Sequence, residues 1–177
     1  MLLSFAFFAT FIQGFSQKQY EFNGGLKLKK YVGFYLTNGL SLNVSSSKIS
    51  NHSIQLGFSV SSSLLGSAMA SNALSTFETE FSVSKFFRMN KRVQPFLKLN
   101  VGAAFVSYGE DAELFSSLPT SSKLCSFEPG LSIVVPKTNN QFLLQLSGGY
   151  NVFYGDGYTG LGTIYPIYGL IGINYKF

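Results

Sequence analysis

The stretch Gly169–Leu170–Ile171–Gly172–Ile173–Asn174–Tyr175–Lys176–Phe177 separates into two faces when every second residue is read. Successive side chains of a β-strand point to opposite sides, so a strand here has one apolar face and one small or polar face. The apolar face carries Ile171, Ile173, Tyr175 and Phe177, and the other carries Gly172, Asn174 and Lys176. The pattern predicts an amphipathic strand, and we expect this strand to close a β-barrel.

The same alternation recurs through the chain and predicts about eight strands, an even number, as closed bacterial barrels have. The predicted segments are 20–30, 40–45, 54–61, 77–87, 97–105, 125–135, 142–152 and 164–177. The connections near 48–52, 89–92 and 137–140 are short, and those near 64–75, 109–122 and 155–163 are long. This asymmetry is typical of an all-β, closed antiparallel up-and-down barrel. Thr37–Asn38–Gly39 has the chemistry of a turn, which leaves the strand register around 31–39 open.

The composition shows that the apolar residues are dispersed. Of 177 residues, a length suited to one domain, 46% are hydrophobic, 16% aromatic and only 12% charged. Beyond the N-terminal segment no apolar run reaches about 18 residues, so we expect no transmembrane helix there. Many short alternating strands disperse apolar residues in this way, and strands that cross lipid give the same weak signal.

We interpret residues 1–16 as a signal peptide and residues 17–177 as the barrel domain. The first 15 residues are almost wholly apolar but too short to span a membrane as a helix. Gly14 and Ser16 place small residues where a signal peptidase requires them. No basic residue precedes Lys18, so the usual charged segment is missing and a start further upstream stays open.

Alternation alone does not decide which face of the strands is inside, because a soluble lipocalin-like barrel has the same period with its apolar face inward. The polar faces here carry mostly Ser, Gly, Asn and Gln, and the single cysteine, Cys125, allows no internal disulfide. Aromatic residues also gather near strand ends, as in membrane interfaces. The predicted interfacial residues are Tyr31, Phe34, Tyr35, Phe86, Phe87, Tyr108, Tyr150, Phe153, Tyr154, Tyr165, Tyr168 and Tyr175. These features predict a transmembrane barrel with its apolar face outward.

The chain resembles the small outer-membrane β-barrel proteins of Gram-negative bacteria, especially the Bacteroidetes-type families. The matching segments are Phe15–Ser16–Gln17, 32–40, Phe86–Phe87–Arg88, Gly148–Gly149–Tyr150–Asn151 and Tyr175–Lys176–Phe177. The resemblance implies a protein of the cell outer membrane, in contact with its lipid. It also implies insertion by the barrel-assembly machinery, whose C-terminal signal is matched by Ile173, Tyr175 and Phe177. We expect a monomer.

Four charged residues, Glu78, Glu80, Lys98 and Glu128, fall on the predicted lumenal faces of three consecutive strands. An eight-stranded barrel has room only for side chains or a small ligand, and a charge buried there must be paired. We interpret the four as a paired lumenal network that fills the interior. The alternative is a polar track for protons or small solutes.

No catalytic, cofactor or metal site is expected. His52 is the only histidine, and its sequence neighbours include no carboxylate, so a Ser–His–acid triad would need an acid from across the barrel. The net charge is +5, but the basic residues are scattered and form no stripe, which argues against a nucleic-acid partner. We therefore expect a protein that is not an enzyme and binds no nucleic acid.

Three functions stay open at this point. The first is a structural or surface-interaction barrel whose long outer loops make contacts outside the cell. The others are a narrow channel for small solutes and a soluble secreted barrel that binds an apolar ligand. Glu110, Asp111 and Glu113 lie in the longest predicted outer loop but lack the spacing of an EF-hand, so we interpret this loop as solvated. The sequence specifies no extracellular ligand.

Overall fold

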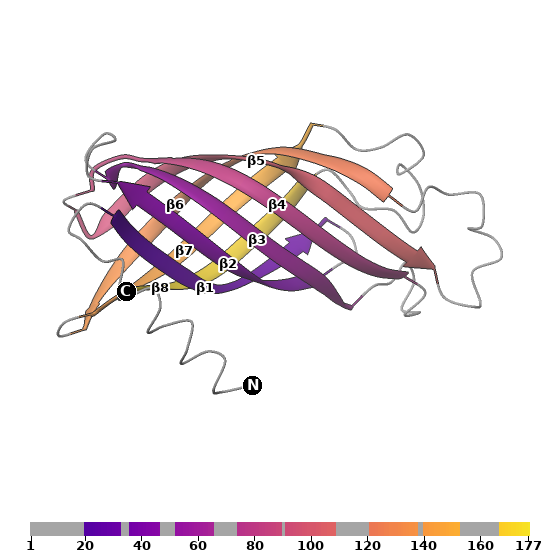
Figure 1. Cartoon of the computed structure of the whole chain (residues 1–177), viewed down its shortest axis with the longest axis horizontal. Helices are drawn as coiled ribbons and strands as arrows, with labels where there is room; N and C mark the ends of the chain where they lie inside the picture. Colours follow the sequence, from indigo (N-terminus) through magenta and orange to yellow (C-terminus); the bar gives the residue numbers. More distant parts are fainter. Residues whose placement is uncertain are drawn as a thin grey trace.

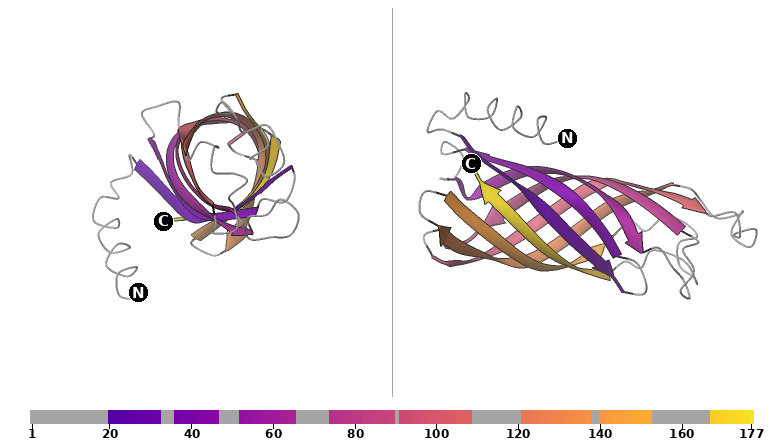
Figure 2. Two further views of the ribbon diagram at one scale, coloured as in Figure 1. Left: turned by 90° about the vertical axis from the view of Figure 1, so that its right-hand side faces the viewer. Right: turned by 90° about the horizontal axis from the view of Figure 1, so that it is seen from below.

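Eight strands form a closed antiparallel barrel in which every strand pairs with its sequence neighbours, so the predicted up-and-down barrel is confirmed (Figures 1 and 2). The strands are β1 (Tyr20–Tyr31), β2 (Leu36–Ser46), β3 (Ile54–Leu65), β4 (Leu74–Phe86), β5 (Val93–Tyr108), β6 (Ser121–Lys137), β7 (Asn140–Asn151) and β8 (Ile167–Lys176). The computed structural model describes residues 20–32, 36–46, 52–65, 74–89, 91–108, 121–137, 140–152 and 167–177. The predicted signal peptide, 1–16, and the acidic residues Glu110, Asp111 and Glu113 lie outside these ranges.

The C-terminal strand closes the cylinder, as its alternation predicts. β1 pairs with β2 on one side and with β8 on the other, so Leu28 lies between Asn38 and Ile171. The view along the axis shows the resulting ring of strands (Figure 2). We call the end at which β8 finishes and β4 connects to β5 the C-terminal rim. Among the described residues no helix is long and apolar enough to cross a membrane.

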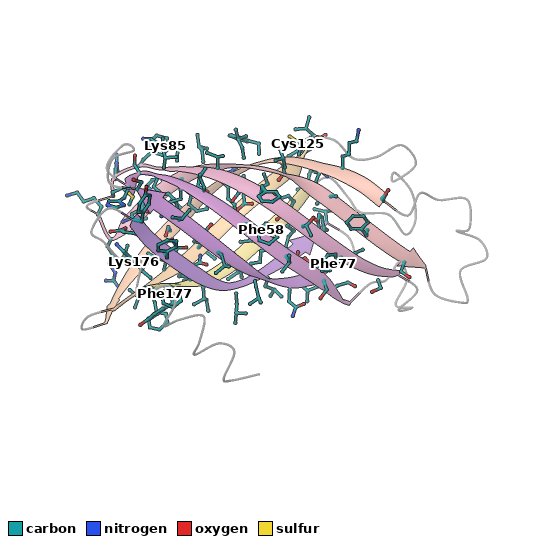
Figure 3. All side chains as sticks on the ribbon, viewed as in Figure 1. Phe58, Phe77, Lys85, Cys125, Lys176 and Phe177 are labelled. Atoms are coloured by element: carbon teal, nitrogen blue, oxygen red, sulfur yellow. The ribbon has the colours of Figure 1, made fainter. Side chains whose placement is uncertain are left out.

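The apolar face of the strands points outward. Leu26 is 64% exposed and Phe81 is 62% exposed, whereas Glu78 is 0% exposed and Glu128 is 1% exposed. Side chains project outward from the barrel wall along both edges of the view in Figure 3. A soluble barrel has the opposite arrangement, with its apolar face buried and its charges in water. The predicted outward orientation of the apolar face is therefore confirmed, and the described strands do not have the inward apolar face of a lipocalin-like barrel.

The segment Thr37–Asn38–Gly39 is part of β2 and forms no turn, which corrects one reading of the sequence. Gly39 pairs with Lys27 across the β1–β2 ladder. A Cβ atom added at Gly39 would lie 2.2 Å from the carbonyl oxygen of Val60 and 2.5 Å from the Cβ of Ser61. The glycine therefore permits close packing inside the barrel, and the register runs on from Leu40 to Thr37.

Three of the predicted interfacial aromatics, Tyr31, Phe86 and Tyr168, are buried in the lumen, so that part of the interpretation is wrong. Each shares its strand parity with lumenal residues, as Tyr31 does with Lys27 and Lys29. Phe87 and Tyr150 are exposed on the exterior, and Tyr175 is half-buried beside other rings. The side chains of Phe34, Tyr35, Tyr108, Phe153, Tyr154 and Tyr165 lie outside the described part of the chain.

Candidate functional site in the barrel lumen

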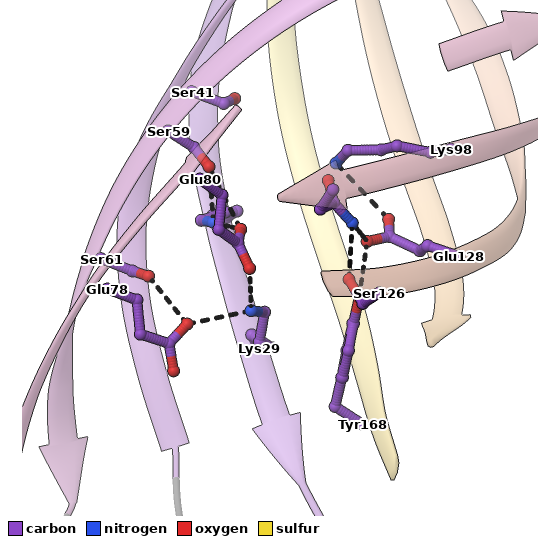
Figure 4. A network of polar contacts seen from close by, with 12 residues as sticks. Lys29, Ser41, Ser59, Ser61, Glu78, Glu80, Lys98, Ser126, Glu128 and Tyr168 are labelled. Carbon is purple, nitrogen blue, oxygen red and sulfur yellow. Dashed lines mark hydrogen bonds and ion pairs between the residues drawn. The ribbon is translucent and has the colours of Figure 1, made fainter. Parts of the chain in front are cut away.

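A cluster of ion pairs spans the lumen between β1 and β4, which are not neighbours in the sheet. The Nζ atom of Lys29 lies 2.9 Å from Oε2 of Glu78 and 2.6 Å from Oε1 of Glu80. The Nζ atom of Lys27 lies 2.6 Å from Oε2 of Glu80. Figure 4 shows Lys29 placed between the two carboxylates. Two ammonium groups thus face two carboxylates, and the cluster is charge-balanced.

Every carboxylate oxygen of this β1–β4 cluster accepts a hydrogen bond. The hydroxyl of Tyr31 donates to Oε1 of Glu78 at 2.7 Å, and Lys29 donates to the Tyr31 oxygen at 3.1 Å. The hydroxyls of Ser61 and Ser59 donate to Glu78 and Glu80 at 3.4 and 3.3 Å. Buried ions are tolerated when their hydrogen-bonding capacity is satisfied in this way, so the cluster is suited to hold the two walls together.

A second cluster surrounds Glu128 on β6. Lys98 approaches its Oε1 atom to 3.5 Å, and the hydroxyl of Ser147 donates to the same oxygen at 2.7 Å. The amide of Asn100 and the hydroxyl of Tyr168 each donate to its Oε2 atom at 3.2 Å. Strands β5, β6, β7 and β8 all contribute to this Glu128 cluster, so it ties together the other side of the barrel wall.

Tyr168 joins the two clusters across the lumen. The Nζ atom of Lys29 lies 4.7 Å from the centre of the Tyr168 ring, within the range of a cation–π contact. The rings of Tyr31 and Tyr168 meet edge to face with their centres 5.6 Å apart. The hydroxyl end of Tyr168 contacts Glu128 and Ser126. Polar contacts therefore run without interruption from β4 to β6.

The four lumenal residues singled out from the sequence occupy both clusters. Glu78 and Glu80 lie together, and Lys98 lies with Glu128; among the described contacts none joins Lys98 to either of the other two carboxylates. The sequence reasoning missed Lys27 and Lys29. Their strand parity already placed them on the polar face of β1, and the two glutamates of β4 required two cations. That charge requirement was the signal that could have identified them.

Towards the C-terminal rim large apolar side chains lie among the polar side chains of the lumen. The rings of Phe86 and Phe96 pack with their centres 5.3 Å apart, and both side chains are buried, as is Leu143 on β7. A Cβ atom at Gly130, the cross-strand partner of Phe96, would lie 2.5 Å from the Cζ atom of that ring. The missing side chain at Gly130 therefore gives Phe96 room to lie across the bore.

His52 has an acidic neighbour on β1 that the local sequence did not reveal. Its Nδ1 atom lies 3.8 Å from Oε2 of Glu21 and 3.4 Å from the hydroxyl of Ser45. A Ser–His–acid relay uses the two ring nitrogens separately, one for the nucleophile and one for the acid. Here both contacts converge on one nitrogen, so this arrangement is not a catalytic relay. Within the described residues no group of three or more His, Cys, Asp or Glu side chains could hold a metal ion.

Comparison with known proteins identifies the fold. No protein-family model and no curated protein sequence matches the chain. Neisserial surface protein A gives a TM-score of 0.57 at 10% identity, over 89% of this chain and 95% of that chain. The outer membrane protein OprG from Pseudomonas aeruginosa gives 0.55 at 12% identity, over 90% and 95%. A major outer membrane protein from Thermus thermophilus gives 0.51 at 13% identity, over 89% and 99%. The chain thus has the fold of small outer-membrane β-barrels.

Removing one charge from the network should destabilise the barrel far more than the same change near its rim. Glu80→Gln leaves the buried Lys27 and Lys29 facing a single carboxylate, and breaking one partner of a buried ion pair costs about 3 kcal/mol. Glu21→Gln is the matched control, because Glu21 and Lys176 form a pair whose side chains are both 31% exposed, and it should cost less than about 1 kcal/mol. Urea unfolding in micelles, followed by far-UV circular dichroism, measures the free energy of unfolding of both variants. Equal losses of unfolding free energy in the two variants would show that the lumenal ion pairs do not stabilise the fold.

Two adjacent glycines of β7 provide a second test. Gly149 pairs with Tyr168, and a Cβ atom there would lie 2.2 Å from the Cζ atom of that ring. Gly149→Ala should therefore push Tyr168 away from Glu128 and destabilise the barrel by about 1–3 kcal/mol. At Gly148 the nearest atom to an added Cβ is 3.7 Å away, so Gly148→Ala should be close to neutral. The same unfolding assay compares the two, and a neutral Gly149→Ala would contradict the placement of Tyr168.

Proposed function

We propose that this protein is an integral β-barrel of the bacterial outer membrane with a structural or surface-contact role and a lumen closed to solutes. The observation that carries the proposal is the charge-balanced network that crosses the lumen from β4 to β6. Separating one of its buried ion pairs costs several kcal/mol. A solute would have to displace the network and also pass the rings of Phe86 and Phe96, so the interior serves as a structural core.

The exterior supports the location in a membrane. The strands are 10 to 17 residues long, and about 9–11 tilted residues suffice to cross the hydrocarbon core. All inter-strand partners are supplied within the closed ring, as lipid requires. Large apolar side chains cover the outer face, including Leu26, Phe81 and Leu99. Acyl chains are the solvent that suits this surface.

The orientation and the route to the membrane belong to the same proposal. Residues 1–16 act as the export signal, and the C-terminal rim faces the periplasm. The long connections between β5 and β6 and between β7 and β8 face the cell exterior. Ile173, Tyr175 and Phe177 act as the signal for the barrel-assembly machinery. Ile173 and Phe177 are exposed on the exterior, where a receptor can reach them, which supports this role. A Bacteroidetes-type relationship rests on the short sequence segments alone.

A surface-contact role is supported by two further considerations. The similar barrel from Neisseria is, by its name, a surface protein. The closed interior leaves the outer connections as the part of the barrel that can make specific contacts. The ligand or partner outside the cell is left undefined by this proposal, and the role requires no cofactor.

A narrow channel for small solutes is the second candidate. The hydroxyls of Thr37, Thr76 and Ser132 and the amide oxygen of Asn100 are buried and have no hydrogen-bond partner within the described part of the chain. Buried polar groups of this kind are commonly satisfied by internal water. A hydrated lumen is therefore compatible with the network, although the apolar rings near the C-terminal rim oppose continuous flow.

Planar-bilayer recording distinguishes the two candidates. With a closed lumen, the inserted wild-type protein should give no discrete conductance steps in potassium chloride, while a porin in the same bilayer gives steps as the positive control. Heat-modifiable mobility on gels confirms that the protein used is folded. Stable steps from the wild type that change when Lys29 is replaced would support the channel instead. Recovery of the protein in the soluble fraction without detergent would contradict both membrane functions.

A further inference from the structure

The described cations divide into those that have partners and a group whose side chains have none among the described residues. Lys27, Lys29, Lys98 and Lys176 form ion pairs, and Lys85 donates a hydrogen bond of 2.6 Å to Ser53. Lys30 and Lys123 also have interactions. By contrast, the side chains of Arg88, Lys91 and Arg92 are exposed and form no ion pair or hydrogen bond with any described residue. All three lie in the connection between β4 and β5.

The backbone that carries these three cations is held in place. The side-chain amide of Gln94, itself buried, donates to the carbonyls of Met89 and Lys91 at 2.8 and 3.2 Å. The N–H of Lys91 donates to the carbonyl of Arg88 at 2.9 Å, and Arg88 has a φ of 57°, a conformation uncommon for residues other than glycine. This fixed backbone reduces the entropy that the connection loses when a ligand binds to its side chains.

The cations lie at the edge of the apolar outer surface. Phe87, the residue that follows β4, is 43% exposed, and Val93, the first residue of β5, is 45% exposed. These two residues flank the three cations. Beyond Phe87 and Val93 the strands carry the lipid-facing residues Val83 and Leu97. In a membrane this places the three charges at the depth of the lipid headgroups, with an aromatic ring at the interface beside them.

We propose that Arg88, Lys91 and Arg92, with Phe87, form a binding site for the headgroup of an anionic phospholipid in the leaflet at the C-terminal rim. This inference rests on the proposed membrane location. Arginine guanidinium groups suit the phosphate oxygens of a lipid, and each basic residue near an anionic surface contributes about 1 kcal/mol. The position beside lipid-facing residues favours a lipid over a soluble anionic protein, whose docking would not require the adjoining apolar surface.

The test measures lipid preference around protein that has already inserted. Wild-type protein is folded into phosphatidylcholine vesicles, its insertion is confirmed by heat-modifiable mobility, and electron spin resonance compares spin-labelled phosphatidylglycerol with spin-labelled phosphatidylcholine. We expect phosphatidylglycerol to associate at least about threefold more strongly at low salt and the preference to fall in 1 M NaCl. Arg88→Gln/Lys91→Gln should reduce the preference at least about twofold. The control variant Lys30→Gln/Lys123→Gln removes the same amount of charge near the opposite rim. It should leave the preference for phosphatidylglycerol unchanged.

The lipid preferences of the wild type and the two double variants decide whether the three cations form the lipid site. Loss of preference in the first double variant alone supports the site. Equal loss in both double variants would show an effect of net charge and overturn it, as would inserted wild-type protein with no preference or with one that salt does not weaken. An unchanged preference in the first double variant would overturn it as well. If that variant fails to fold, the single variants Arg88→Gln and Lys91→Gln are compared with Lys30→Gln, and only the first two should weaken the preference. A wild-type protein that does not insert would contradict the membrane function itself and is distinguished by the gel assay.

Discussion

The structure depends on how eight polar strand faces are satisfied inside one narrow cylinder. Once the apolar faces turn outward, every polar side chain of the other face shares a space in which little water fits. Lys29 meets this constraint most fully, because its ammonium group contacts Glu78 and Glu80, the hydroxyl of Tyr31 and the ring of Tyr168. Its partners come from strands on both sides of the barrel. The lumen is thus a polar core, and it takes the place that an apolar core has in a soluble domain.

This inverted arrangement links the fold to the proposed function. A filled lumen leaves the outer connections and the two rims as the parts free to make contacts, while the wall provides a rigid support. The glycines take part in this packing, since Gly39 admits the neighbouring strand, and Gly130 and Gly149 admit the rings of Phe96 and Tyr168. The aromatic–glycine pairs place large side chains across the bore without displacing the strands. Side-chain packing as well as charge therefore supports the proposed closed interior.

The period of two in the sequence was enough to predict the strands and the closure by β8. The outward orientation of the apolar face was predicted from the weakly charged polar faces, the single cysteine and the aromatic residues near strand ends. The period of two was less informative where one residue type serves two environments. Tyr31 and Tyr168 resemble interfacial aromatics by position, and only their parity, shared with Lys29 and with Asn174, places them inside. Likewise, Thr37–Asn38–Gly39 has turn chemistry but continues β2. The ion pairs that connect β1 with β4 across the lumen depend on the diameter and stagger of the barrel, which local sequence patterns do not encode.

Lipid contact at chosen positions tests the central claim most directly. In a Cys125→Ser background, single cysteines replacing Leu56 and Leu99 on the exterior, and Gln55 in the lumen, would carry a fluorescent label in vesicles with brominated acyl chains. Heat-modifiable mobility selects the labelled proteins that remain folded. Strong quenching at Leu56 and Leu99 with little at Gln55 is expected. Quenching at Gln55, with the two leucine positions shielded from the lipid, would contradict the account.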